Sequence, residues 1–521
     1  MTSIQIGAHQ ADRFRGRSGD LPLQTSSPHR LCRIEGSGWI RVIAIVSLLA
    51  SCCSWQVARA DYAIYQIPGT DAGLLLEGTT NYNPGGTVTF RHPRGSLYFN
   101  ARDLQVIQTP TRQTIFKRKS GKILSEKTVD NYIKLAQWAL QHGMLKECKS
   151  LLSDAWKLDP SDTKIKKLAS LMVHINRPVP NDSASEAHVR NLIGGSRMEM
   201  SRSKHFALFH DAQSEKDAVT KMTRAEMRLE LLEKVYESYF LTFALRGFYL
   251  KPPSEPLNAV LFSEHKDFLL MERRLEMGLK QVAGFYLPEE NVSFFYDSGT
   301  TEIFLYLKEL TDKLDEMKDQ AKRTRSPNAA HIIRFANTVS LLIDIEHESE
   351  DVATVSHEAV HQLAANTGLF PRDGVFIRWV HEGLASYFES SKLAVWSGVG
   401  VVDQNRISYY RALEGDTVRG SVEFIVSDLG FIVESALGDQ LPAYGQAWAL
   451  THYLFTERFD ELIQFYGKSR KIPVDTPPKE KGMELVELFN ECFGDRVTLE
   501  LEWRRYMRTL KTDMEQLAEE L

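Results

Sequence analysis

The chain has 521 residues, of which 43% are hydrophobic and 25% are charged, and its formal net charge is -5. Because 63 Lys and Arg residues are balanced by 68 Asp and Glu residues, no general attraction to nucleic acid or to acidic membranes is indicated. The contents of 32 Gly, 19 Pro and 5 Cys exclude collagen-like chains and disulfide-stapled domains. A chain of this length and composition is typical of a globular protein with about two to four folded units.

The first predicted element is an export segment at residues 1–60. Residues 42–50 (VIAIVSLLA) follow Arg41, and as a helix they would rise only about 14 Å, less than the roughly 30 Å of a bilayer core. We interpret them as the apolar region of a signal peptide. Two processing sites compete: an A-x-A motif at residues 58–60, and a lipobox-like sequence that would place a lipid anchor on Cys52. We therefore expect an exported protein, either periplasmic or secreted, or else lipid-anchored to the cell envelope.

Two further expectations depend on this leader. Residues 1–30 are polar and unpatterned, which favours a true start near Leu31. If cleavage follows Ala60, the exported chain retains only Cys148 and Cys492, which we interpret as two buried thiols.

Two small units are predicted next. Residues 61–118 alternate apolar and polar side chains between Pro-Gly turns, which is typical of a small β-rich unit. Residues 125–176 carry apolar side chains at helical spacing on both sides of Gly143, and this pattern resembles a single tetratricopeptide-type helical hairpin. Since one repeat cannot bury its own apolar face, we expect it to dock on a neighbouring unit.

A linker is predicted at residues 177–202, which contain two Pro residues and a Gly-Gly pair. From residue 203 to 521, strands and helices follow one another without strict alternation, which favours a mixed α+β domain with a helical C-terminal part. The expected elements are strands at 205–209, 257–262, 284–287 and 292–296 and a helix at 216–245. A charged segment at 301–325 is interpreted as a solvated helical hairpin inserted into the domain, and the apolar stretch 328–346 fits either a helix or a buried strand.

The sequence HEAVH at residues 357–361 is an H-E-x-x-H motif. Residues four apart lie on one face of a helix, so His357 and His361 can converge on a single Zn2+. Glu358 projects about 100° away from His357 and can reach a metal-bound water instead of the metal. Acidic residues at 348–351 are expected to occupy the first turn of this helix.

A catalytic zinc site needs a third protein ligand. Where the metzincin pattern requires Gly and His, this chain has Ala364 and Thr367, so that source is excluded. The remaining common source is a glutamate on a second helix, and Glu382 in the sequence WVHEGLASYFE fits it. Gly383 is expected to let the two motif helices approach closely.

Two neighbours of Glu382 have other expected roles. His381 could be a ligand instead, but its position beside Glu382 favours a place near the metal shell or at the surface. Glu389 is expected to be solvated.

HEAVHQ followed by WVHEGLASYFE resembles the gluzincin clan of zinc metallopeptidases, and more closely the exported bacterial peptidase-MA-like proteins of unknown function. The similarity covers roughly residues 200–470. It implies a zincin-like metallopeptidase domain with Glu358 as the general base. The metal ligands that it implies are His357, His361 and Glu382.

The resemblance also implies hydrolysis of a peptide bond by metal-activated water, with Glu358 moving the proton to the leaving amine. The sequence YGQAWAL from Tyr444 is similar to a later helix of the same group. We interpret Tyr444 as the donor that stabilises the oxyanion, with His452 as the alternative. The sequence therefore predicts an exported zinc peptidase that acts on peptides or proteins. The alternative is an envelope protein that binds peptides or proteins without catalysis through a structural zincin-like domain.

Overall fold

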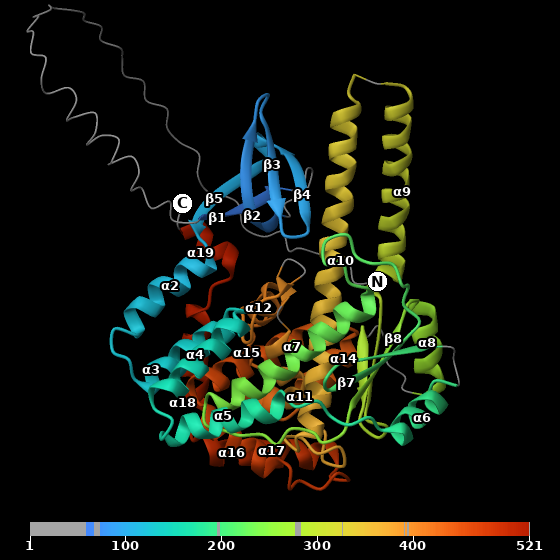
Figure 1. Cartoon of the computed structure of the whole chain (residues 1–521). Coiled ribbons are helices and arrows are strands. Elements are labelled where there is room, and N and C mark those ends of the chain that lie inside the picture. Colours follow the sequence, from blue (N-terminus) through green and yellow to red (C-terminus); the bar gives the residue numbers. More distant parts are fainter. Residues whose placement is uncertain are drawn as a thin grey trace, which may run out of the picture.

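The structure is a computed structural model that describes residues 59–66, 73–194, 198–276, 283–325, 327–389, 391–392 and 395–519. The apolar run at residues 42–50 and Cys52 lie outside the described residues. Among the described helices, none combines the length and the apolar character needed to cross a membrane. Figure 1 shows an antiparallel sheet at one end of the molecule, a mixed sheet near the other end, and a very long helix that passes beside both.

The first sheet has five antiparallel strands. They pair in the order β4-β3-β2-β1-β5. Their bounds are β1 Arg59–Gln66, β2 Gly73–Asn83, β3 Thr87–His92, β4 Gly95–Asn100 and β5 Leu104–Pro110. Val88 and Phe90 are fully buried while the residue between them is half-buried, so the period-2 pattern of the sequence reflects one face turned to a core. The predicted β-rich unit is present, but it ends at Pro110 and residues 112–118 belong to a helix.

This sheet obtains part of its core from helix α10 (Ala329–Asn366). Leu341 and Leu342 of α10 pack against the buried side chains of the sheet. The backbone N–H of Tyr98 in β4 donates a hydrogen bond to Thr338 Oγ1 of α10 over 2.8 Å. The N-terminal sheet is therefore attached to the same helix that carries the H-E-x-x-H motif.

Four helices follow the sheet: α2 Arg112–Ile123, α3 Val129–Gln141, α4 Leu145–Leu158 and α5 Thr163–Ile175. The turn between α3 and α4 contains Gly143 with a φ of +72°, a conformation that favours glycine. Residues 125–176 thus form three helices and not a single hairpin, because the Asp162 side chain caps a further helix by accepting bonds from the N–H groups of Lys164 and Ile165. Their apolar faces join the main core, as expected for a unit that docks on a neighbour.

The predicted linker at residues 177–202 is wrong for much of its length. It contains helix α6 (Ser183–Leu192) and strand β6 (Glu199–Arg202). The Asp182 side chain caps α6, and Val189 is fully buried. Turn-forming residues here mark the start of a capped helix and do not separate two domains.

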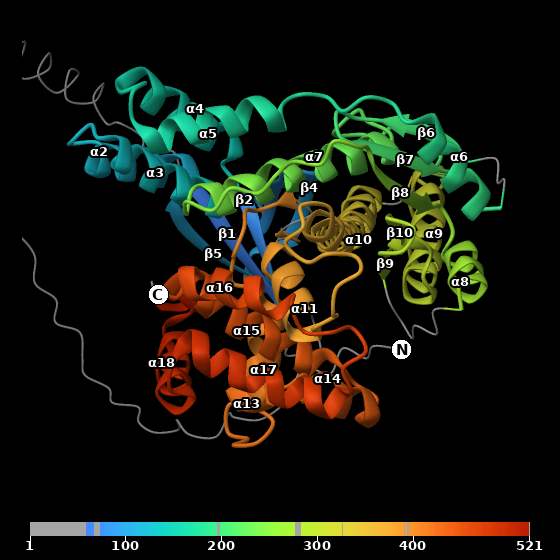
Figure 2. The same cartoon turned by 90° about the horizontal axis from the view of Figure 1, so that it is seen from below.

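The second sheet is mixed. Its strands pair in the order β6-β7-β8-β10-β9, with β7 (Phe206–His210), β8 (Leu257–Phe262) and β10 (Val292–Tyr296) parallel and the outer strands β6 and β9 (Gly284–Leu287) antiparallel. Helices α7 (Arg224–Ala244) and α8 (His265–Arg274) connect these strands. Figure 2 shows α10 and α7 beside this sheet. The fold class is mixed α+β, as predicted from the sequence.

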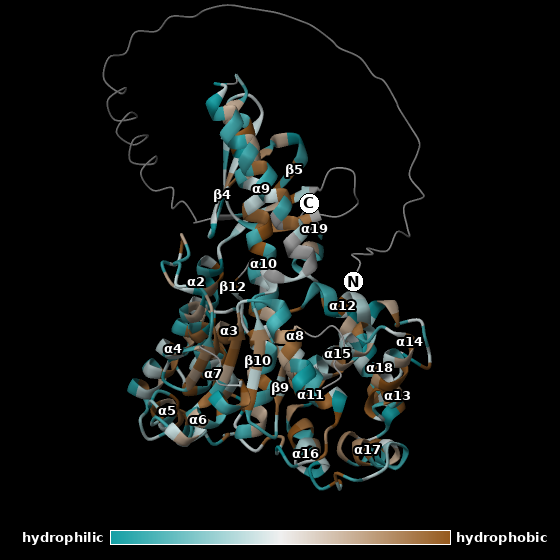
Figure 3. Ribbon diagram, turned by 90° about the vertical axis from the view of Figure 1, so that its right-hand side faces the viewer, coloured by the Kyte–Doolittle hydropathy of each residue, from teal (hydrophilic) through white to brown (hydrophobic). Residues whose placement is uncertain are grey.

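Residues 301–325 form one helix, α9 (Glu302–Arg323), which pairs with the first half of α10. The apolar stretch at 328–346 is therefore helical, and the hairpin predicted inside 301–325 is instead built from two longer helices. The projecting end of this hairpin is mainly hydrophilic (Figure 3). The acidic residues at 348–351 lie in the middle of α10 and not in a first turn, because no Gly or Pro interrupts residues 329–366.

The C-terminal part is helical, as predicted. Its helices are α11 Arg378–Phe388, α12 Gln404–Ala412, α13 Val422–Val426, α14 Leu429–Leu437, α15 Leu441–Glu457, α16 Phe459–Ser469, α17 Pro478–Phe493, α18 Arg496–Thr509 and α19 Asp513–Glu519. A two-residue hairpin, β11 Ser391–Lys392 and β12 Val395–Trp396, follows α11. Trp379, Trp448 and Trp503 are completely buried in this part. Cys148 and Cys492 are free and buried, as expected.

Gly383 allows a close approach, but between α11 and α15 and not between the two motif helices. A Cβ atom on Gly383 would lie 2.2 Å from Thr451 Oγ1 and 2.8 Å from the carbonyl oxygen of Ala447. We expect Gly383→Ala to lower the free energy of unfolding by about 1–3 kcal/mol in urea titrations, because the two helices would have to separate. Gly467→Ala in α16 is the matched control. Its nearest neighbour would be 3.8 Å away, so this change should leave stability unchanged or raise it by roughly 0.5–1 kcal/mol. Equal effects of both changes would contradict the packing argument.

Candidate functional site

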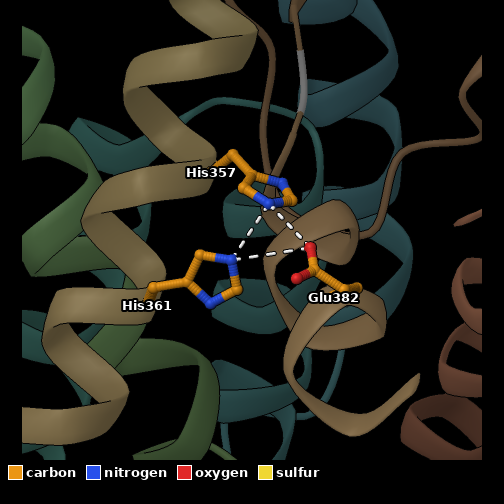
Figure 4. Close-up of side chains that lie close together, drawn as sticks. All are labelled: His357, His361 and Glu382. Carbon is orange, nitrogen blue, oxygen red and sulfur yellow. Dashed lines mark hydrogen bonds and ion pairs between the residues drawn. The ribbon is translucent and has the colours of Figure 1, made fainter. Parts of the chain in front are cut away.

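Three side chains from two helices converge on one point (Figure 4). His357 and His361 come from α10, and Glu382 comes from α11. The Nε2 atoms of the two histidines are 3.0 Å apart, and Glu382 Oε2 lies 3.1 Å from His357 Nε2 and 3.6 Å from His361 Nε2. Ligands at 2.0–2.1 Å around a tetrahedral metal are separated by about 3.3 Å. These three atoms can therefore occupy three corners of a metal site and leave the fourth open.

Helix α10 is held against the mixed sheet by Gln362, the residue after the motif. Its Nε2 group donates to the carbonyl oxygens of Asn258 over 2.9 Å and Asn291 over 3.1 Å, and its Oε1 accepts from Ser293 Oγ over 3.3 Å. Gln362 is fully buried. Because this amide satisfies groups on two strand residues and on Asn291 in the turn before β10, it fixes the rotation of α10 and hence the side to which both histidines point.

Helix α11 is positioned by a carboxylate from a distant part of the chain. Asp428 accepts hydrogen bonds from the N–H groups of Arg378 over 3.0 Å and Trp379 over 3.1 Å, so it caps the N-terminus of α11. Trp379 packs against Phe465 and Phe489. The cap and this aromatic contact set the position of the helix that presents Glu382.

Glu389 is not solvated, contrary to the expectation from the sequence. It caps the C-terminal end of α11, and its Oε1 accepts a hydrogen bond from His357 Nδ1 over 2.5 Å. Arg406 of α12 binds the same carboxylate, which keeps it only 11% exposed. The bond to Nδ1 leaves Nε2 of His357 as the nitrogen that faces Glu382 and His361.

The charge of His357 depends on these carboxylates. Burial alone would disfavour the imidazolium, but Glu389 and Glu382 outweigh it and raise the pKa of His357 to about 10. Burial would raise the pKa of Glu382, but the neighbouring imidazoles of His361 and His357 prevail and hold it well below its ordinary value. The site therefore favours positive charge at His357 Nε2, which is where a metal cation would replace the proton.

Glu358 lies beside the three converging side chains but is not part of that group. It is 7% exposed, and burial raises its pKa, although both motif histidines oppose this effect. A Cβ atom on Gly284, at the start of β9, would lie 3.0 Å from Glu358 Cγ. The carboxylate thus sits between α10 and the edge strand of the mixed sheet, in a setting that makes it a stronger proton acceptor than a solvated glutamate.

Tyr444 of α15 also lies at the site. Its ring centroid is 6.4 Å from that of His357, and Phe431 contacts its ring edge-on at 5.2 Å. The negative charge of Glu382, followed by burial, raises the pKa of Tyr444 well above its ordinary value. The phenol is therefore protonated and able to donate a hydrogen bond.

His452, the alternative to Tyr444, has other partners. Its Nδ1 bonds with the hydroxyl of Tyr506 over 2.9 Å, and its Nε2 with the carbonyl oxygen of Gly400 over 3.1 Å. Burial lowers the pKa of His452 to about 4. Both ring nitrogens are engaged, so His452 connects α15 to α18 and the loop before α12.

His381 is not among the converging residues. Its Nδ1 donates to the carbonyl oxygen of Ile377 over 2.8 Å, and its ring packs between Phe370 and Phe376. Burial lowers the pKa of His381 to about 4, so the ring is neutral. It packs beside the site, as the sequence suggested.

A second cluster contains His347 and Asp351 of α10 and Asp297 from the segment after β10, and their ligand atoms lie close enough to share a metal ion. Arg224 pairs with Asp297 at 3.0 Å, and Arg228 pairs with Asp351. Because cationic side chains already compensate these carboxylates, we interpret the cluster as an ion-pair network that joins α7, α10 and the segment after β10.

The stability of the protein should depend on pH through the charge of His347. Burial opposes its charge, but hydrogen bonds to Asp297 and Asp351 prevail and raise the pKa of His347 from 6.5 to about 9. Since the folded-state pKa is the higher one, the stabilisation is complete below about pH 6.5 and is lost as the pH rises through about 9. In urea titrations at pH 6, the free energy of unfolding of the wild type should exceed that of His347→Gln by on the order of 3 kcal/mol. The difference should shrink strongly by pH 10, and a constant difference would contradict the assignment.

The fold and the site together define an α+β protein with a candidate metal centre between two helices. Residues 351–475 match the model of a family described as "Protein of unknown function (DUF1570)". No curated protein matches the chain. The matched span contains the side chains that form the candidate site: His357, Glu358, His361, Glu382, Glu389, Arg406 and Tyr444.

The sequence interpretation missed two residues of the site. The signal for Glu389 was its spacing. It follows Glu382 by seven residues, or about two helical turns, which places both glutamates on the same side of a helix. Arg406 carried no such signal, because only the packing of α12 against α15 brings it to Glu389.

Proposed function

We propose that the protein is an exported zinc-dependent peptidase of the gluzincin type. The observation that carries this proposal is the convergence of His357, His361 and Glu382, while Glu358 stays outside the ligand set. Two imidazoles and one carboxylate around an open fourth position are the donor set of hydrolytic zinc centres. The export part of the proposal depends on the predicted signal peptide.

The side chains have separate roles in the proposed reaction. Zinc, when bound, supplies the Lewis acidity that polarises a water molecule and the scissile carbonyl. Glu358 accepts a proton from the attacking water and passes it to the leaving amine. Tyr444, kept protonated beside Glu382, donates a hydrogen bond to the oxygen on which negative charge develops.

The edge strand β9 supports a peptide as the substrate. It is the last strand of the mixed sheet, and in the described part of the chain no strand pairs with its outer edge. Gly284 at its start lies against Glu358. An extended peptide can add to an edge strand through main-chain hydrogen bonds, which would bring its backbone past the proposed base.

Two measurements on the purified chain test the proposal together: the metal content by elemental analysis and the cleavage of an unbiased peptide library. We expect about one zinc per chain and cleavage that a chelator abolishes. Zinc without any cleavage would favour the alternative, an envelope protein that binds peptides or proteins through a structural domain. A chain that takes up no zinc would contradict the proposal.

A further inference from the structure

Arg406 binds Glu389 through a two-pronged contact. Its Nε donates to Oε2 over 2.9 Å, and its Nη2 lies 2.8 Å from Oε1 and 2.7 Å from Oε2. The two side chains are 15% and 11% exposed, so solvent screens the pair weakly. A planar guanidinium is suited to this geometry, and a lysine ammonium is not.

The carboxylate held by Arg406 is the one that orients His357. Glu389 Oε1 accepts from His357 Nδ1 over 2.5 Å, while His357 Nε2 faces Glu382. Since Glu389 lies at the end of α11, its side chain has no following helical turn to restrain it. Arg406 supplies that restraint from a different helix.

The same guanidinium also packs on Tyr444. Its central carbon lies 5.1 Å from the centroid of the Tyr444 ring, and Phe431 contacts that ring edge-on. Gly445 leaves the room that this contact needs. A Cβ atom at this position would lie 2.6 Å from Tyr409 Cβ and 3.0 Å from the carbonyl oxygen of Arg406. Helices α12 and α15 can therefore approach closely at the position that places the guanidinium on the phenol ring.

We propose that Arg406 is a positioning residue that sets two parts of the site at once: the orientation of His357, through Glu389, and the position of the Tyr444 ring, by direct stacking. The inference rests on the proposed function, because it assigns one residue to both the metal ligand and the oxyanion donor. It goes beyond charge compensation, since a lysine at 406 would keep the charge but lose the fork and the planar stacking surface.

The test compares Arg406→Lys with Arg411→Lys, a control on the same helix whose guanidinium forms a surface pair with Glu515. Three readouts are measured on the full chain: zinc affinity by chelator competition, the visible absorption spectrum of the Co2+-substituted protein, and kcat and KM for a peptide from the library. Arg406→Lys should weaken zinc binding roughly 10- to 100-fold and shift the Co2+ spectrum. It should lower kcat at least about 10-fold with a smaller change in KM. Arg411→Lys should match wild type.

Two further variants separate the arms of the proposal. Glu389→Gln should change the Co2+ spectrum as Arg406→Lys does. In a Tyr444→Phe background, Arg406→Lys should lower kcat by a smaller factor than in wild type, because the oxyanion donor is already absent. Glu389→Gln leaves Arg406 in place, so it also tests the role toward His357 if Arg406→Lys fails to fold.

The outcomes distinguish this inference from the proposed function. If wild type binds zinc and cleaves peptides but Arg406→Lys has an unchanged spectrum, zinc affinity and kcat, the positioning role is wrong and the peptidase proposal stands. If wild type binds neither zinc nor Co2+, both are wrong. If metal binding changes in Arg406→Lys but no variant cleaves peptides, the role toward His357 is supported while the peptidase proposal and the role toward Tyr444 are contradicted.

Discussion

Glu358→Gln should strongly slow peptide cleavage while zinc stays bound. Glutamine has nearly the same size as glutamate but cannot accept the proton, and the three proposed ligands are left in place. General acid-base catalysis contributes about 100- to 10,000-fold, or about 2.7–5.5 kcal/mol of transition-state free energy. We expect kcat to fall by a factor within that range. The metal content, measured by elemental analysis, should stay near one zinc per chain.

The matched control for this change is Glu346→Gln, the same substitution at an exposed position on the same helix. It should retain wild-type turnover and zinc. A zinc-bound Glu358→Gln protein whose turnover is within about threefold of wild type would show that Glu358 is not the base. In that case the measured hydrolysis would come from a contaminant or from other groups, and the binding-protein alternative would gain support.

His361→Ala should remove the metal. It deletes one of three protein ligands, and the two that remain, His357 and Glu382, carry opposite charges that can pair with each other at 3.1 Å. We expect zinc content to fall from about one per chain to near zero after dialysis against a weak chelator. Since bound metal stabilises only the folded chain, the zinc-dependent rise in Tm should disappear with it.

His331→Ala is the control for this experiment, because His331 is an exposed histidine on the same helix, far from the converging side chains. It should leave both zinc content and Tm unchanged. The zinc content of His357→Ala and of Glu382→Ala tests the other two proposed ligands in the same way. Wild-type zinc content in both of these variants would refute the assignment of the three ligands.

Local patterns predicted the helix of the H-E-x-x-H motif and four strands of the mixed sheet. Helical spacing places His357 and His361 on one face of any helix, whatever surrounds it, and the alternation of β3 requires one buried face. Four strands of the mixed sheet lie within one or two residues of their predicted bounds, since each is a short apolar run bordered by turn residues. These properties depend on neighbours in the chain, so the sequence alone determines them.

Predictions that depended on boundaries failed for a physical reason. Residues 177–202 have the composition of a linker, but the Asp182 cap and the burial of Val189 convert part of it into a packed helix. The acidic residues at 348–351 resemble a helix start, yet they lie in the middle of the long helix α10. There they pair with Arg224 and Arg228 of α7. Caps, charges and apolar residues indicate what a segment can do, and their tertiary partners decide which of these options is realised.

The sequence by itself determined the α+β class, the H-E-x-x-H helix and the candidate third ligand Glu382, because each rests on residue type and short-range spacing. Only the tertiary structure decided that Glu389 orients His357, that Arg406 reaches both Glu389 and Tyr444, and that Gly383 faces α15. Those contacts join residues that lie 17 or more positions apart in the chain. No local pattern encodes them, since they exist only when burial of the apolar faces brings α10, α11, α12 and α15 together.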